Sequence, residues 1–193
     1  MFPYCINNPT NYLDSEGTDA VWIQEEENVL TMGHTGLLVE NEDGDWYFFY
    51  WGMESEGINL PNIFAALRGT DAKIVWEKLE TNNFDLTKTS GVISALKRSN
   101  NKDVDRSNLV TDTIYLEGDY SKTWDYLKNL EKAPPKYNLI SNNCVQQSNK
   151  ALQCSNPIFG LTYAVIPNSA FMNARLANCL KSALDRFIEG MVP

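Results

Sequence analysis

The sequence predicts an α+β fold in which helices pack on one small antiparallel sheet. Two apolar, β-prone segments, residues 33–39 and 46–51, flank an Asp-Gly pair that is typical of a hairpin turn. Further Val- and Ile-rich stretches alternate with segments of helical spacing. The 193 residues, 43% of them hydrophobic and 21% charged, are enough for one domain with a core and too few for two.

Residues 1–17 are rich in turn formers and show no hydrophobic periodicity, which predicts a tail. The folded domain is therefore expected over 18–193. Its first feature is the hairpin, with Asp43-Gly44 as a two-residue turn that would place Trp51 opposite Gly36. Because the two strands are almost unbroken apolar runs, we expect both of their faces to be buried.

The remaining elements follow from local signals. Strands are expected over 72–79 and 109–116, and helices over 62–67, 86–97 and 121–131. Ser121 is expected to cap the last of these helices, and Pro134 to prevent its continuation. Residues 100–107 are polar and predict an exposed loop. A C-terminal helix over 169–190 carries an apolar stripe that we expect in the core: Met172, Leu176, Leu180, Leu184, Phe187 and Met191.

Two residues stand out as candidates for chemistry. His34 is the only histidine, and it lies between Gly33 and Gly36 at the start of an apolar strand, where glycine permits close approach of a ligand. Cys144 follows Asn143, a good helix cap, so it falls in the first turn of a short helix. Backbone N–H groups at that position favour a thiolate and can bind an oxyanion.

Other sites are not predicted. The four cysteines form no CxxC pair and have no histidine nearby, so neither a zinc site nor a cofactor is expected. The net charge of −9 disfavours nucleic acid as a partner. No apolar run is long enough to cross a bilayer, and the N-terminus does not resemble a secretion signal.

The two candidate blocks, Gly-His-Thr-Gly-Leu-Leu-Val at 33–39 and Tyr-Asn-Leu-Ile-Ser-Asn-Asn-Cys at 137–144, resemble the circularly permuted NlpC-type papain-like proteins. That group includes the lecithin:retinol acyltransferase-like enzymes and several bacterial peptidases and toxins. The histidine block precedes the cysteine block, as in the permuted branch. The resemblance implies a papain-like cysteine hydrolase or transferase, with Cys144 as the nucleophile and His34 as the base.

The sequence departs from this family in two places. The acyltransferases follow their cysteine with Glu-His-Phe, whereas residues 145–147 are Val-Gln-Gln, so lipid acyl transfer has no specific support. The residue that orients the histidine is also not evident. Tyr50, Tyr137 and Asn143 are candidates for orienting the base or supporting the oxyanion, with core packing as the simpler role for Tyr137.

The stretch from Tyr4 to Gly17 resembles the end of the core domain of Rhs-repeat proteins, with Ser15 where that family usually has proline. There the segment marks the junction with a variable C-terminal toxin. The resemblance implies a toxin or effector for interbacterial competition, secreted or delivered into a target cell as part of a larger Rhs protein. Its partners would be a protein, peptide or other amide or ester substrate and a cognate immunity protein.

Two alternatives remain open at this point. The same fold could serve as a non-catalytic binding module in which Cys144 only packs, and the weak match at the orienting position favours this hypothesis. The chain could also be an immunity or adaptor protein, which its negative charge would suit. The Rhs-like N-terminus argues against the latter. The residues do not distinguish a peptidase from an amidase, a deamidase or an acyltransferase.

Overall fold

The computed structural model describes residues 18–25, 34–53 and 60–162, together with residues 169, 171–173, 175, 176, 178 and 179. The tail predicted over 1–17 lies outside these residues.

Five strands form one sheet in the order β4-β3-β2-β1-β5, and every neighbouring pair is antiparallel. Strands β2, β3 and β4 follow one another as a meander, whereas β5 returns to the far side of β1. The strands are β1 (Ala20–Glu25), β2 (His34–Glu40), β3 (Trp46–Met53), β4 (Ala72–Lys78) and β5 (Val110–Leu116). The predicted α+β class with one antiparallel sheet is confirmed.

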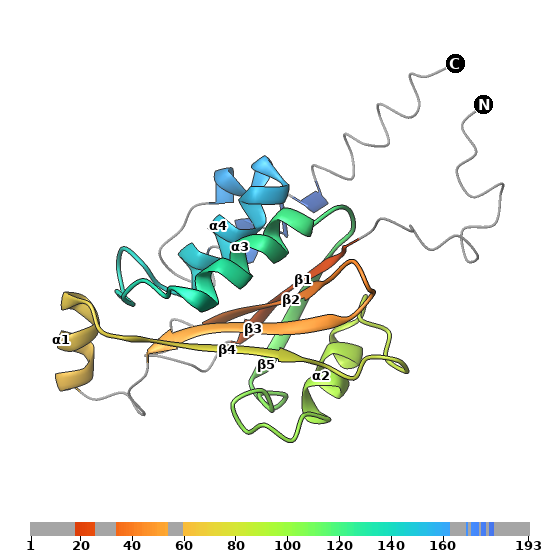
Figure 1. Cartoon of the computed structure of the whole chain (residues 1–193), viewed down its shortest axis with the longest axis horizontal. Coiled ribbons are helices and arrows are strands. Elements are labelled where there is room, and N and C mark those ends of the chain that lie inside the picture. The colour runs from red at the N-terminus through yellow and green to blue at the C-terminus, as the bar shows by residue number, and fades with distance from the viewer. Residues whose placement is uncertain are drawn as a thin grey trace, which may run out of the picture.

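Helices cover both faces of this sheet. Helices α3 and α4 lie side by side over one face, α2 lies over the other, and α1 lies at the end where β4 begins (Figure 1). The helices are α1 (Leu60–Arg68), α2 (Thr89–Lys97), α3 (Ser121–Lys132) and α4 (Cys144–Ser155), followed by the short 3-10 helix η2 (Pro157–Thr162). We call the two sides the α4 face and the α2 face.

Successive residues of each strand alternate between two separate apolar cores, as the strand period of two requires. The core on the α4 face includes Trp22, Leu37, Phe49, Val145 and Leu152. The core on the α2 face includes Val21, Leu38, Phe48, Val92 and Leu96. The expected burial of both faces of the hairpin strands is therefore confirmed.

The predicted hairpin is present, but its register was wrong by one residue. Gly36 lies opposite Tyr50 rather than opposite Trp51. Because side chains alternate, the shift places Tyr50 on the same face as residues 34 and 36 of β2 and moves Trp51 to the other face.

The side chain of Asn41 causes this shift. Its Oδ1 accepts hydrogen bonds from the backbone N–H groups of Asp43 at 3.1 Å and Asp45 at 2.8 Å, and the backbone N–H of Asn41 donates to the carbonyl of Asp45. These bonds close a five-residue loop over 41–45 in place of the two-residue turn. Gly44 still has the left-handed conformation of a turn residue, with φ of 79°.

Two helix starts also differ from the prediction because aspartate side chains hold the preceding turns. Helix α2 begins at Thr89, later than predicted, since Asp85 accepts hydrogen bonds from the N–H and hydroxyl of Thr87 and holds a turn there. Ser121 is the first residue of α3 rather than its cap. Its N–H donates to Asp119 Oδ1 at 2.9 Å.

Two expectations about burial need correction, and one strand was not predicted. The polar segment 100–107 is not wholly exposed, because Val104 is fully buried. Of the C-terminal stripe, Met172 and Leu176 are 64% and 62% exposed, while Phe171 packs into the core on the α4 face. The stripe residues from 180 onward lie outside the described part of the chain. Strand β1 was not predicted, because its four apolar residues 20–23 form only a short run.

Candidate active site

Cys144 is the first residue of α4, in the position that the sequence predicts. Asn143 precedes it as an N-cap in extended conformation, with φ −101° and ψ −178°. The Asn143 side chain accepts a hydrogen bond from the N–H of Gln146 at 3.1 Å, and Gln146 Oε1 accepts one from the N–H of Asn143 at 2.9 Å. This capping box fixes the start of the helix and holds the thiol at its positive end.

A polar turn before α4 holds this cap in place. Asn138 Oδ1 accepts hydrogen bonds from the N–H groups of Ile140 at 3.0 Å and Ser141 at 2.9 Å. Gln146 Nε2 donates to the carbonyl of Ile140 at 2.7 Å, and Asn138 Nδ2 donates to the carbonyl of Leu67 in α1 at 2.8 Å. The amide-rich sequence before and after Cys144 therefore pairs the backbone groups of its own turn.

The thiol of Cys144 is buried, with 3% of the residue exposed. Burial raises its pKa to about 11. Hydrogen bonds from the backbone and hydroxyl of Thr35 and from the backbone of Val145 act in the opposite direction, and the charge of Glu25 adds to the rise. A cysteine at a helix start is ordinarily acidic, but here desolvation outweighs that effect and the thiol is protonated at neutral pH.

His34, at the start of β2, is also buried, with 2% of the residue exposed. Burial lowers its pKa to about 4, although the charge of Glu25 raises it and that of Arg106 lowers it further. The imidazole is therefore neutral at pH 7. Its ring stacks on Tyr50 with centroids 4.3 Å apart and planes at 27°. Nε2 has no hydrogen-bond partner in the part of the chain that the structure describes.

An ion pair completes the surroundings of His34 on the α2 face. Glu25, which is fully buried, lies directly across from His34 in the ladder between β1 and β2. Arg106 donates to both of its carboxylate oxygens, at 2.7 and 2.6 Å. The same guanidinium lies over the ring of Tyr50, 4.4 Å from its centroid. This bidentate pairing compensates the buried charge of Glu25.

The fold brings the histidine and cysteine blocks together at one end of β2 but directs their side chains to opposite faces. Thr35 lies on the α4 face, where its hydroxyl is 3.3 Å from Ser148 Oγ and where it hydrogen-bonds to the thiol of Cys144. Its neighbour His34 points the other way, toward Tyr50 on the α2 face. Thr35 is thus the residue of β2 that contacts the thiol.

The three predicted supporting residues divide between the two faces in the same way. Asn143 caps the helix of Cys144, and Tyr137, 3% exposed, packs in the core on the α4 face. Burial raises the pKa of Tyr137, and the neighbouring Cys144 adds to the rise. Tyr50 lies with His34, and burial raises its pKa to about 12. Neither tyrosine is ionised at neutral pH.

The sequence did not identify four of the residues around these side chains. Thr35 and Ser148 carried a weak signal, since Thr35 adjoins His34 and Ser148 is one helical turn from residue 144. Glu25 and Arg106 carried none. They are 81 positions apart in the sequence, and Arg106 belongs to the segment that was predicted to be an exposed loop.

Within the described ranges, no group of three or more His, Cys, Asp or Glu side chains is placed to hold a metal ion. No helix in the same ranges is long and apolar enough to span a membrane. Comparison with protein-family models, with curated proteins and with solved structures found no match. The site consists of a capped helix start that carries a thiol and, on the other face of the same strand end, a buried polar cluster.

Proposed function

We propose that this chain is a toxin or effector domain of the Rhs type that acts by thiol-dependent amide or acyl chemistry on a permuted NlpC-type papain-like fold. The observation that carries the proposal is the position of Cys144 at the capped start of α4, in contact with the strand that begins at His34. The Rhs-like segment 4–17 supports delivery into a target cell and a cognate immunity protein in the producing cell.

In the proposed reaction, Cys144 Sγ attacks the carbonyl carbon of an amide or ester while the thiol proton passes to the imidazole of His34. Backbone N–H groups at the start of α4, including that of Val145, are donors for the resulting oxyanion. The leaving amine or alcohol takes the proton from the imidazolium, and a thioester remains. Water then releases the acid and restores the thiol, or an acceptor amine or hydroxyl takes the acyl group.

Burial keeps the thiol protonated and the imidazole neutral at pH 7, and these are the states from which this reaction starts. The imidazole of His34 is not yet in the position that the reaction requires. The ring of His34 must leave its stack on Tyr50 and reach the side of Thr35 before it can accept the proton. The proposal therefore includes a rearrangement at this strand end when substrate binds.

Expression in a bacterial host, with and without an export signal, tests the proposal. Wild type should arrest growth in the compartment that holds the substrate. Cys144→Ala and His34→Ala should each relieve the arrest. The double variant should relieve it no further than either single variant, because the effects of substitutions within one catalytic unit are not additive. Cys154→Ala, which removes an exposed free thiol, is the matched control and should remain toxic.

The placement of His34 and Cys144 on opposite faces favours a second candidate, a non-catalytic binding module on the same fold. In that case the thiol only packs against Thr35 and the core of the α4 face. Toxicity that persists in Cys144→Ala would support the binding module and exclude the enzyme. Loss of toxicity in Cys144→Ala but not in His34→Ala would support thiol chemistry and exclude His34 as the base.

A further inference from the structure

Three of the four arginines in the described part of the chain share one arrangement, with the guanidinium over an aromatic ring and a carboxylate beside it. The three instances among the described residues are Arg106 with Tyr50 and Glu25, Arg98 with Phe84 and Glu80, and Arg175 with Phe171 and Asp112. The ring centroids lie 4.4, 5.4 and 5.5 Å from the guanidinium carbon. Guanidinium suits such sites because it is planar, stacks on rings and pairs with carboxylate.

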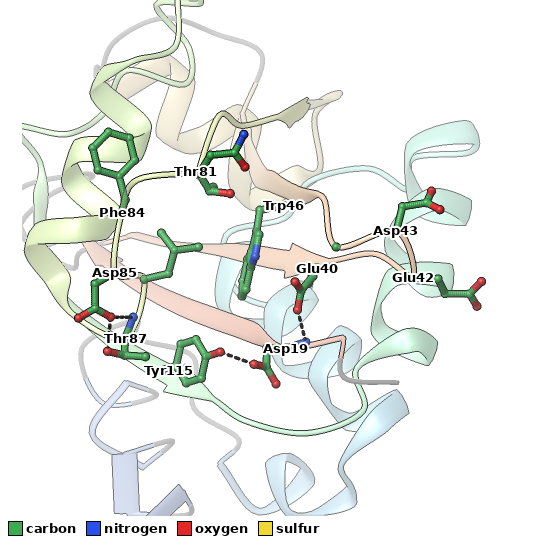
Figure 2. Close-up of a pocket in the computed structure, with 13 residues that line it drawn as sticks. Asp19, Glu40, Glu42, Asp43, Trp46, Thr81, Phe84, Asp85, Thr87 and Tyr115 are labelled. Carbon is green, nitrogen blue, oxygen red and sulfur yellow. Dashed lines mark hydrogen bonds between the residues drawn. The ribbon is translucent and has the colours of Figure 1, made fainter. Parts of the chain in front are cut away.

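A fourth set of the same kinds of group lines a pocket of about 540 Å³ but holds no arginine (Figure 2). The rings are those of Trp46 and Tyr115, whose centroids are 6.4 Å apart, and the carboxylates are those of Asp19 and Glu40. Among the described residues that line it there is no lysine or arginine. The pocket lies at the end of β2 that is farthest from Thr35 and Cys144.

Neutral donors hold the two carboxylates in place. Asp19 accepts hydrogen bonds from the hydroxyl of Tyr115 and from the N–H of Gly118 at 2.9 Å. Glu40 accepts one from the N–H of Asp19 at 3.3 Å and another from the side chain of Trp46. Figure 2 shows the bonds that Asp19 makes with Tyr115 and Glu40. Two carboxylates are thus fixed side by side with no ion pair to either in the described part of the chain.

This arrangement has an electrostatic cost that a cation would relieve. Burial raises the pKa of Glu40, and the neighbouring charge of Asp19 raises it further. At the rim, Glu42 and Asp43 are exposed and add negative charge. Two other groups around the pocket already have partners. Asp85 forms an ion pair with Lys88, and the guanidinium of Arg98 lies over the ring of Phe84. The uncompensated part of the pocket is therefore the side formed by Trp46, Tyr115, Asp19 and Glu40.

We propose that this pocket binds the guanidinium of an arginine side chain on a partner polypeptide. The charge would pair with Glu40 and Asp19 while the plane lies against Trp46, as the protein's own arginines lie. The exposed rim leaves room for the ligand to remain attached to a chain, and the net charge of −9 attracts basic partners to the protein as a whole. The inference does not depend on the chemistry of Cys144, which lies at the other end of β2.

NMR of the full chain tests this inference, with the indole N–H of Trp46 as the reporter. N-acetyl-arginine amide should shift this signal in a saturable way, and N-acetyl-citrulline amide, its neutral isostere, should bind at least about tenfold more weakly because it lacks the charge. Glu40→Gln should weaken arginine binding about tenfold while keeping an acceptor for Trp46. Glu131→Gln removes an exposed charge from α3 and is the matched control that should leave binding unchanged.

Several results would overturn the inference. Equal responses to the arginine and citrulline amides would exclude recognition of the charge. Unchanged binding in Glu40→Gln, or an equal loss in Glu131→Gln, would show that general charge rather than the pocket attracts the ligand. If Glu40→Gln fails to fold, Glu42→Gln at the exposed rim replaces it and should weaken binding about threefold. Tighter binding of propylguanidinium, a singly charged guanidinium without a peptide backbone, would exclude a polypeptide as the source.

Discussion

The single histidine of this chain makes its buried polar cluster directly measurable. We expect the imidazole of His34 to titrate with a pKa of about 4 in the folded protein, because burial opposes its charged form and Arg106 adds to the effect. In the unfolded chain the same group titrates near about 6.5. With one imidazole in the sequence, its NMR signals need no assignment among several histidines.

This difference predicts how stability depends on pH. Between about pH 6.5 and 4 the unfolded chain binds a proton at His34 and the folded protein does not, so falling pH favours unfolding. The contribution of His34 is fully present above about pH 6.5 and is lost as the pH falls toward about 4. The difference between a pKa of about 6.5 in the unfolded chain and about 4 in the folded protein corresponds to about 3 kcal/mol in the free energy of unfolding.

Urea denaturation of wild type and His34→Phe at pH 7.5 and 4.5 measures this contribution. The phenyl ring can keep the stack on Tyr50 but cannot take a proton. Wild type should lose about 2.5 kcal/mol more than the variant between these two pH values, since the carboxylates respond to pH in both proteins. Equal losses, or an imidazole that titrates near pH 6.5 in the folded protein, would refute the placement of His34 in a buried stack.

Three further substitutions test other contacts of the site. Thr35→Val should raise the pKa of Cys144 above its value in Thr35→Ser, which keeps the hydroxyl; equal values in an NMR titration of the cysteine Cβ would contradict the contact. Arg106→Met removes the guanidinium that pairs with the buried carboxylate of Glu25 and should cost about 3–5 kcal/mol in urea unfolding, with much of the loss recovered on adding Glu25→Gln. A loss below about 1 kcal/mol would mean that water replaces the guanidinium. Asn143→Ala should cost about 1 kcal/mol of unfolding free energy through the lost cap. Asn143→Asp keeps the cap oxygen but loses the Nδ2 donor to the carbonyl of Leu139, so it should fall between wild type and Asn143→Ala. Equal stability of all three would show the cap to be dispensable.

Local signals in the sequence were sufficient to predict Cys144 at a helix start. Asn143 and Gln146 are three positions apart and satisfy each other's backbone groups, so the cap does not depend on distant parts of the chain. The hairpin strands were predictable for a similar reason, since their apolar runs and the turn between them are contiguous. Cys144 begins its helix as predicted, and the two strands lie in the predicted segments although their register differs by one residue.

Such local signals could not predict on which face of the sheet each side chain lies. One hydrogen-bonding side chain, Asn41, lengthens the hairpin loop and changes the register, which puts Tyr50 rather than Trp51 beside His34. The ion pair between Glu25 and Arg106 forms only when distant segments meet. Local periodicity holds no information about such a contact, so the surroundings of His34 could not be derived from it.

The position of β1 inside the sheet affects how the chain would yield to a mechanical pull. It is the first strand of the described chain, and it is hydrogen-bonded along both edges, to β2 and to β5. A force applied to the polypeptide ahead of Ala20 would shear two ladders at once instead of peeling one edge open. If the chain is pulled through a narrow pore from its N-terminal side, unfolding should therefore meet strong resistance at β1, before any other part of the sheet is disturbed.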